Sequence, residues 1–267
     1  MSDLHVLLTN DDGIESVGFA ALYDALSEFA EVTAVAPAED QSAVGRKMSS
    51  SVDVVEHEYG YAIEGTPADC VVVGLEALCP DVDMVVAGCN KGANLGAYVL
   101  GRSGTVSAAV EAAFFDVPAI AVSLYVPATE DSTADSWRDA ASDTSDYRNA
   151  TAATTYLVEH ALGAGVFEQA EYLNVNAPMP LESGELAPLE ITEPSTAYDM
   201  RTESDENGVI HLQDYIWRRM RDDTIPDPEG TDRRAVVDDK VSVSPLTAPH
   251  TTRHHEALDA LAETYRD

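Results

Sequence analysis

The chain has 267 residues, with 48 Asp and Glu against 15 Lys and Arg, and a formal charge of −33. This acidity disfavours binding to a nucleic-acid polymer or to an anionic membrane surface, because both require clustered Lys and Arg. Acidic residues are spread evenly, with 19 in residues 1–127 and 29 in residues 128–267, so there is no acidic tail. An even acidic surface that is poor in lysine suits a high-salt cytoplasm, where counterions screen the repulsion.

The first part of the chain predicts a strand, a helix and a second strand. Leu4–Thr9 is an apolar run that ends in the polar turn Asn10–Gly13. A second apolar strand, Glu31–Ala36, ends at Pro37. Between the two strands, apolar side chains recur at helical spacing at Phe19, Leu22, Leu26 and Phe29. A strand–helix–strand unit of this length is a right-handed crossover between parallel strands.

The same alternation continues to residue 124. Val52–Val55 and Tyr61–Ile63 are expected to be short strands, and Thr66 and Pro67 are a helix cap and a first helical position. The expected elements that follow are a helix at Ala68–Leu78, a strand at Asp83–Ala87, a helix at Thr105–Phe115 and a strand at Ala119–Leu124. The expected fold class is α/β, a Rossmann-like open and mostly parallel sheet with helices on both faces.

Beyond residue 125 the pattern changes. Residues 130–146 are polar and acidic and are expected to form a surface insertion, followed by a helix at Arg148–Leu162 and a strand at Tyr172–Val175. We therefore expect an α/β catalytic core at residues 1–180. Residues 181–267 are expected to form a hairpin and helix extension that includes a short motif returning to the core.

Within that extension, short alternating segments are typical of hairpins and not of helix crossovers. Examples are His211–Trp217 and Lys240–Ser244, and a terminal helix is expected at Arg253–Tyr265. The three cysteines form no CxxC pair, which favours buried free thiols in a reducing compartment. We find neither a signal peptide nor a membrane span in the sequence, so a cytoplasmic protein is expected.

Polar side chains follow the strands, and the carboxyl ends of parallel strands are where ligands bind in such sheets. Asp11 and Asp12 are adjacent after the first strand, and their charges repel unless a cation neutralises them. An all-oxygen ligand set favours Mg²⁺ or Mn²⁺ over zinc. The alternative is a solvated turn stabilised by its own Asx hydrogen bonds.

A glycine-rich stretch, Gly88–Gly96, follows the strand at Asp83–Ala87 and carries Asn90 and Asn94. Backbone N–H groups and amide side chains of this kind can hold an anion. Ser103–Thr105 adds donors at a helix N-terminus. The alternative is a flexible connecting loop. Positive charge supports the first interpretation, because the basic residues of positions 1–127 all fall in strand-end loops, at Arg46, Lys47, Lys91 and Arg102.

Together these segments resemble a known family. The stretches LLTNDDGIESVGFAAL, VAPAEDQSAVG, GTPADC, DMVVAGCNKGANLG, SGTVSAA and LNVNAP are similar to the SurE family of metal-dependent 5′/3′-nucleotidases. The resemblance covers roughly residues 4–125 and resumes at 174–178, with a fainter match from Gly230–Asp232 to Val241–Leu246. Departures are an extra residue between Gly96 and Ser103, Arg102 in place of a tyrosine, Asp239-Lys240 in a region that normally contains glycine, and the 130–146 segment.

The resemblance implies one divalent ion, Mg²⁺ or Mn²⁺, and hydrolysis of nucleoside 5′- or 3′-monophosphates. It implies metal ligation by Asp11, Asp12, Ser42 and Asn90, and catalysis by Asp11 and Asp12, with Asp11 as base for a water or as a nucleophile. Phosphate or substrate binding is expected from Asn10, Gly13, Lys91, Gly92, Asn94, Ser103, Gly104 and Thr105. It also implies a homodimer or homotetramer built through the C-terminal elements.

Two other classes of function remain open at this point. A receiver-like signalling domain also places an acidic pair after its first strand and binds Mg²⁺, but it needs about half this length. A non-catalytic nucleotide-binding oligomer would bind the same ligands without turnover. Assay of an aryl phosphate with Mn²⁺ distinguishes these from an enzyme.

Overall fold

A computed structural model describes residues 4–127, 140–251 and 256–265. Within these residues the chain forms one nine-stranded sheet and a separate two-stranded ladder. From edge to edge, the strands of the large sheet are β3 (Val54–His57), β4 (Gly60–Ile63), β2 (Glu31–Pro37), β1 (His5–Thr9), β5 (Met84–Lys91), β6 (Ala119–Tyr125), β7 (Tyr172–Pro178), β11 (Val241–Leu246) and β8 (Leu189–Ile191). The six strands from β4 to β7 run parallel.

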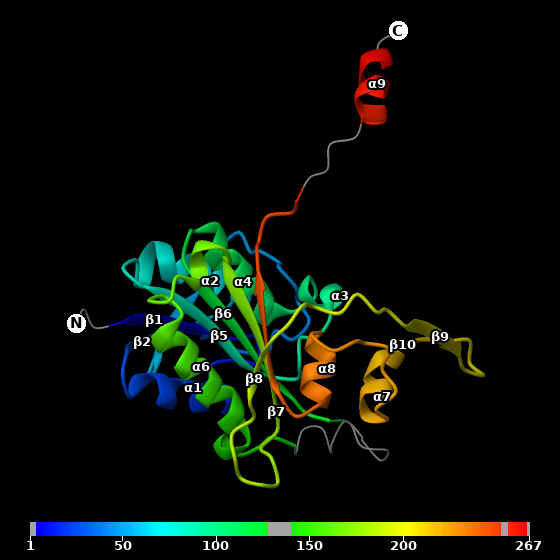
Figure 1. Cartoon of the computed structure of the whole chain (residues 1–267). Coiled ribbons are helices and arrows are strands. Elements are labelled where there is room, and N and C mark those ends of the chain that lie inside the picture. The colour runs from blue at the N-terminus through cyan, green and yellow to red at the C-terminus, as the bar shows by residue number, and fades with distance from the viewer. Residues whose placement is uncertain (1–3, 128–139, 252–255, 266–267) are drawn as a thin grey trace.

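Helices cover both faces of this sheet (Figure 1). On one face lie α1 (Val17–Ser27) and α6 (Arg148–His160), and on the other lie α2 (Pro67–Val73) and α4 (Gly104–Phe114). Side chains of strand β1 pack on both faces of the sheet. Val6 and Leu8 lie in the core on the α1 face, and Leu7 lies in the core on the α2 face. The alternation follows from the two-residue period of a strand. This confirms the expected α/β class.

Helix α2 begins as its sequence predicts. Thr66 accepts a hydrogen bond from the backbone N–H of Asp69, and the Asp69 carboxylate accepts from the N–H of Thr66, which makes a capping box with Pro67 at the first position. The helix continues as a π-helical turn, Gly74–Leu78. A side chain at Gly74 would collide with Leu7, because its Cβ would lie 2.2 Å from the Leu7 Cδ1 atom.

Strand β5 is longer than expected, which corrects the prediction that Asn90 and Lys91 lie in a loop. After a register shift between Ala87 and Asn90, these two residues pair with Ser123 and Leu124 of β6. The irregularity falls at Gly88, where a Cβ would lie 2.3 Å from a backbone oxygen of the neighbouring strand. Glycine here allows the two strands to stay close while the ladder changes register.

The expectation that the short alternating segments of residues 181–245 form hairpins is wrong in part. The segment His211–Trp217 divides into β10 (Ile210–Asp214) and α7 (Tyr215–Arg221), and a further helix, α8 (Asp232–Val237), precedes β11. The Asp214 side chain accepts a hydrogen bond from the N–H of Ile216 and so caps α7. Helix caps of this kind are visible in sequence, but seven-residue helices are too short to show a periodic pattern.

One part of the C-terminal extension (residues 181–267) joins the large sheet, and other parts project from the body of the molecule. Strand β11 pairs antiparallel with β7 and parallel with β8, whereas β10 pairs with β9 (Met200–Ser204) in a ladder that projects outward (Figure 1). Beyond β11, helix α9 (Glu256–Thr264) stands away from the body, and its residues are exposed. The expected terminal helix is present in the described residues.

Part of the expected acidic insertion, residues 130–139, lies outside the described residues. Its end forms a short 3₁₀ turn, Thr144–Tyr147, which the Asp143 side chain caps and which leads into α6. Among the described residues, no helix is both long enough and apolar enough to span a membrane.

Candidate functional site

The carboxyl ends of β1, β5, β6 and β7, named here the carboxyl edge, bring distant polar residues together. The Asp11 backbone oxygen accepts a hydrogen bond from Gln41 N–H (2.7 Å), which holds the loop after β2 against the end of β1. The end of β5 meets the same turn, because Lys91 N–H donates to the Asp12 Oδ2 atom at 2.7 Å. Three loops that are separate in sequence therefore share one edge.

Asp11 is buried against the N-terminus of α4. The Thr105 hydroxyl donates to its Oδ1 atom at 2.6 Å, and the Thr105 backbone N–H also donates to it. Gly104 allows this approach, since a Cβ there would lie 2.7 Å from the Asp11 Cβ and 2.8 Å from its Oδ2 atom. Burial nevertheless dominates and raises the pKa of Asp11 from 3.8 to about 6, against the lowering effect of the Thr105 hydrogen bonds.

Asp12 is partly buried beside Asp11. Burial, and to a lesser extent the charge of Asp11, raise its pKa from 3.8 to about 7, against the lowering effect of the hydrogen bond from Lys91 N–H. Asp40, at the end of the β2 loop, adds negative charge near both carboxylates. The hydrogen bonds from the protein do not offset the cost of ionising these two carboxylates. A bound cation would neutralise their charge.

The remaining expected metal ligands lie on either side of this pair. The Asn90 amide nitrogen donates to the Gly92 carbonyl, so its amide oxygen is the atom suited to a hard cation. The exposed Ser42 hydroxyl donates to Asp40 Oδ1 at 2.6 Å. No cluster of three or more His, Cys, Asp or Glu side chains that could hold a metal occurs in the described residues. The residues expected to ligate a metal would thus offer two carboxylates and neutral oxygens, a set that suits Mg²⁺ or Mn²⁺.

Asn10 and Gly13 shape the turn that presents the two carboxylates. The buried Asn10 side chain donates to the Gly13 carbonyl at 2.7 Å and to the Ser16 hydroxyl at 2.9 Å. Gly13 has a φ of +94°, a conformation that glycine adopts most easily. The Asn10 Oδ1 atom is buried without a hydrogen-bond partner. Asn10 therefore contacts the turn itself in this structure.

Asn94 stands at the centre of a buried polar network. Its N–H donates to Asn176 Oδ1 (2.7 Å), and its carbonyl accepts from the side-chain amides of Asn174 (2.9 Å) and Asn176 (3.3 Å). Its side-chain amide donates to Ser123 Oγ (2.9 Å) and, more weakly, to Thr105 Oγ1 (3.4 Å). Since Thr105 binds Asp11, the network joins the Gly92–Gly96 loop to the first carboxylate.

Sequence reasoning gave no role to Ser123, Asn174 or Asn176 in this network. A signal was present, because Asn174 and Asn176 are two apart at the end of an apolar strand and so share one face. Buried polar side chains in such a strand need partners, which points to a network.

Positive charge is less concentrated at the edge than the sequence suggested. Arg46 donates to Glu111 of α4 at 2.8 Å and stacks over Phe114, and the Arg102 guanidinium lies over the Tyr98 ring. Of the four basic residues in the strand-end loops, Lys91 contacts the Asp12 carboxylate, through its backbone N–H. The Ser103 hydroxyl caps α4 by accepting a hydrogen bond from the N–H of Val106 at 3.0 Å.

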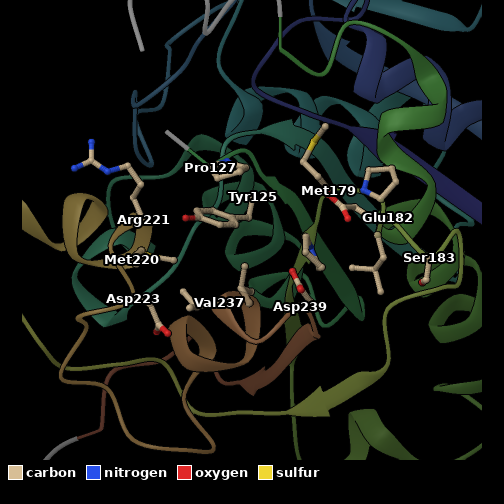
Figure 2. A pocket seen from close by; sticks show the side chains of 14 residues that line it. Tyr125, Pro127, Met179, Glu182, Ser183, Met220, Arg221, Asp223, Val237 and Asp239 are labelled. Atoms are coloured by element: carbon tan, nitrogen blue, oxygen red, sulfur yellow. The ribbon is translucent and has the colours of Figure 1, made fainter. Parts of the chain in front are cut away.

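A cavity of about 720 Å³ lies at the carboxyl ends of β6 and β7, and Figure 2 shows the side chains that line it. Tyr125 and Met179 line it from the sheet, and Met220 and Val237 line it from α7 and α8. Neither Asp11 nor Asp12 lines the cavity. Its charged lining consists of three carboxylates and one guanidinium, at Glu182, Asp223, Asp239 and Arg221. This charge disfavours a phosphate, so the candidate anion site is the carboxylate and glycine-loop edge.

Comparison with known proteins agrees with the geometry. Residues 6–200 match the family described as "Survival protein SurE". A Haloquadratum walsbyi protein named "5'-nucleotidase SurE" is 65% identical over 99% of this chain and 98% of its own length. A protein of the same name from Haloarcula marismortui is 66% identical over 99% and 96%. The crystal structure of the Aquifex aeolicus SurE protein superposes with a TM-score of 0.75 at 28% identity, covering 98% of each chain.

Proposed function

The chain belongs to the SurE family, and we propose that it hydrolyses nucleoside 5′- or 3′-monophosphates to a nucleoside and phosphate at the carboxyl edge. The observation that carries this proposal is the meeting of Asp11, Asp12 and the amide-rich Gly92–Gly96 loop at one point. Paired carboxylates suit a divalent cation, and the adjoining N–H and hydroxyl donors suit the oxygens of a phosphate.

In the proposed reaction, protein donors hold the phosphate and Asp11 handles the proton. We expect Asn94, Ser103 and Thr105 to hold the phosphate beside the N-terminus of α4, which favours negative charge. Asp11, held by Thr105, accepts the proton of the attacking water as the water oxygen bonds to phosphorus. The ester P–O bond breaks, and the departing nucleoside oxygen takes a proton from solvent. A divalent ion held by Asp11, Asp12, Asn90 and Ser42 would neutralise charge on the phosphoryl oxygens.

The proposal is tested with a panel of nucleoside 5′- and 3′-monophosphates, each assayed with Mg²⁺ and Mn²⁺ and after chelation. We expect release of inorganic phosphate that requires the metal and returns when the metal is restored. An equal rate with and without metal would contradict the metal proposal. No release from any monophosphate would contradict the activity itself.

An alternative chemistry makes Asp11 the nucleophile, with an aspartyl-phosphate intermediate. Rapid quenching during turnover followed by peptide mass spectrometry distinguishes the two. We expect no phosphate on Asp11. A phosphorylated Asp11 peptide would replace water attack with the covalent route.

We also propose that the chain assembles as a homodimer or homotetramer through residues 181–267. Support comes from large apolar side chains that a single copy leaves exposed, at Ile191, Ile210, Leu212, Leu258 and Leu261. The double variant Leu258→Ser/Leu261→Ser should lower the mass measured by light scattering without changing the far-ultraviolet spectrum. A monomeric mass for the unaltered protein would contradict the proposal.

The even acidic surface and the free thiols support a reducing, salt-rich cytoplasm as the setting. All three cysteines are buried and free, and burial raises the pKa of each thiol. We expect the protein to lose structure on dialysis from molar salt into low salt, since screening of its −33 charge is then removed. Unchanged stability in low salt would contradict the proposed salt adaptation.

A further inference from the structure

We propose that Asp232 and Arg233, the first residues of α8, form a clamp that positions the Gly92–Gly96 loop for catalysis. The proposal rests on the hydrolytic function above. It assigns a positioning role to two residues that are far in sequence from Asp11 and Asp12. Their partners belong to the loop and to residues 195–197, a segment without regular secondary structure.

Asp232 holds the two segments together through its carboxylate. Its Oδ2 atom accepts from Gly96 N–H at 2.6 Å, and its Oδ1 atom accepts from the N–H groups of Ser195 (2.9 Å) and of Arg233 (2.8 Å). The side chain is fully buried, so each of these bonds replaces water that cannot reach it. An amide at this position could accept on one side only, because its nitrogen would face donors on the other.

Arg233 supports the same loop from the next position. Its guanidinium, which is 1% exposed, donates to Ala197 O (2.9 Å), Ser195 Oγ (3.2 Å) and Leu95 O (3.4 Å), and lies 3.5 Å from the buried Asp227 carboxylate. A fork of several donors is needed to reach these groups at once, and lysine lacks one.

Gly96 is fitted to this guanidinium. Its φ is +88°, and a Cβ at this position would lie 2.0 Å from the Arg233 Nη2 atom. The loop therefore passes directly over Arg233, with no side chain between them. From Gly96 the path to the reaction is short: Asn94 is two residues away, and it contacts the Thr105 hydroxyl that binds Asp11.

Two variants test the clamp against a matched control. Asp232→Asn is nearly isosteric and removes one acceptor. Arg233→Lys keeps the charge opposite Asp227 but removes the fork. The control, Arg234→Met, changes the adjacent residue of the same helix, whose guanidinium pairs with Asp223 and Asp238 at the surface. Far-ultraviolet spectra and melting temperatures establish that each variant is folded at the assay temperature.

We expect kcat/KM to fall about 10–100-fold in Asp232→Asn and Arg233→Lys, as when a supporting partner of an active-site group is lost. The fall should be equal for a nucleoside monophosphate and for p-nitrophenyl phosphate, because the loop holds the phosphoryl group that both share. The Arg234→Met control should stay within about twofold. A purely structural role for Arg233 would instead be rescued by lysine, with kinetics like the control, and that result overturns the clamp.

Hydrogen exchange of the peptide covering residues 92–97 provides a readout that does not depend on activity. In the unaltered protein the Gly96 amide should exchange slowly, and both clamp variants should exchange faster by about tenfold or more. Rapid exchange in the unaltered protein overturns the clamp whether or not the variants fold. If the unaltered protein hydrolyses no substrate, the proposed function is contradicted. The hydrogen-exchange measurement still shows whether Asp232 and Arg233 hold the loop.

Discussion

The carboxyl edge and the outer part of the C-terminal extension differ in burial: the edge buries polar side chains, and the extension exposes apolar ones. At the edge, Asn94, Asn174 and Asn176 are buried and hydrogen-bond to one another between the Gly92–Gly96 loop and strand β7. In the extension, Ile210 and Leu212 are exposed. A buried polar network lowers stability unless its polar atoms are hydrogen-bonded. Exposed apolar side chains, by contrast, indicate a surface that another molecule can cover.

This difference indicates where the molecule tolerates change. The edge has precise geometry, so small displacements there should affect turnover strongly. Charges of the extension pair at the surface, as in the ion pairs of Asp199 with Arg201 and Arg219. Such pairs contribute little because water and salt screen them. The following variants test this contrast, in order of decreasing effect.

Asp11→Asn should abolish turnover, with a loss of about 10³-fold or more, because the acceptor for the proton and a metal ligand are both removed. The fold should remain, since asparagine fills the same volume. Phosphate release and circular dichroism are the measurements. Turnover within tenfold of the unaltered protein would show that the edge is not the reaction centre.

Gly104→Ala should lower kcat/KM by about 10²-fold, because the added methyl group would lie 2.7 Å from the Asp11 Cβ and must displace it. Gly101→Ala is the matched control in the same segment. No atom lies within 4 Å of its added Cβ, and its φ of −76° suits alanine. Equal kinetics for the two variants would argue against tight geometry at Asp11.

The pH dependence of metal-free stability should expose the cost of the buried carboxylates. Since folding raises the pKa of Asp12 from 3.8 to about 7, the folded state binds more protons between these values, and stability falls as pH rises through them. Asp12→Asn should flatten this fall, with a difference in melting temperature on the order of 5 °C by pH 8. Adding Mn²⁺ at pH 8 should raise the melting temperature of the unaltered protein and not that of Asp12→Asn. Parallel curves for the two proteins would contradict the assignment.

Asp199→Asn should have the smallest effect, although it removes two ion pairs at once. We expect the melting temperature to change by less than about 2 °C, and the change to shrink in molar salt. Differential scanning calorimetry at two salt concentrations provides the measurement. A large change that persists in salt would mean that the extension is as tightly specified as the edge.

Sequence patterns predict the parallel core well, because its strands are continuous apolar runs and two of its helices, α2 and α4, begin at capping side chains. Thr66 with Pro67 is an example, and the helix begins there. The same patterns fail at β5, where a glycine at a register shift looks like the start of a loop. They also fail at α7 and α8, which are too short to show helical periodicity.

In the candidate site, the sequence identifies the residues that follow strand ends. It does not identify the residues that hold these side chains in place. Asp11 and Asp12 are visible because adjacent carboxylates after an apolar strand are unusual. Asp232 contacts Gly96 across 136 positions, and nothing local at either residue indicates the other. Arg46 shows the converse error, since its loop position suggested phosphate binding but it pairs with Glu111.

The contact between Gly96 and Asp232 has a consequence for how the protein is made. A ribosome releases the chain from its N-terminus, so β1, β5 and α4 are outside long before α8 is synthesised. Until then the backbone groups of Leu95 and Gly96 lack the partners that hold them in the finished protein. If the proposed clamp positions the loop, the nascent chain carries both carboxylates before the loop is held, and full activity is expected only once α8 has been synthesised.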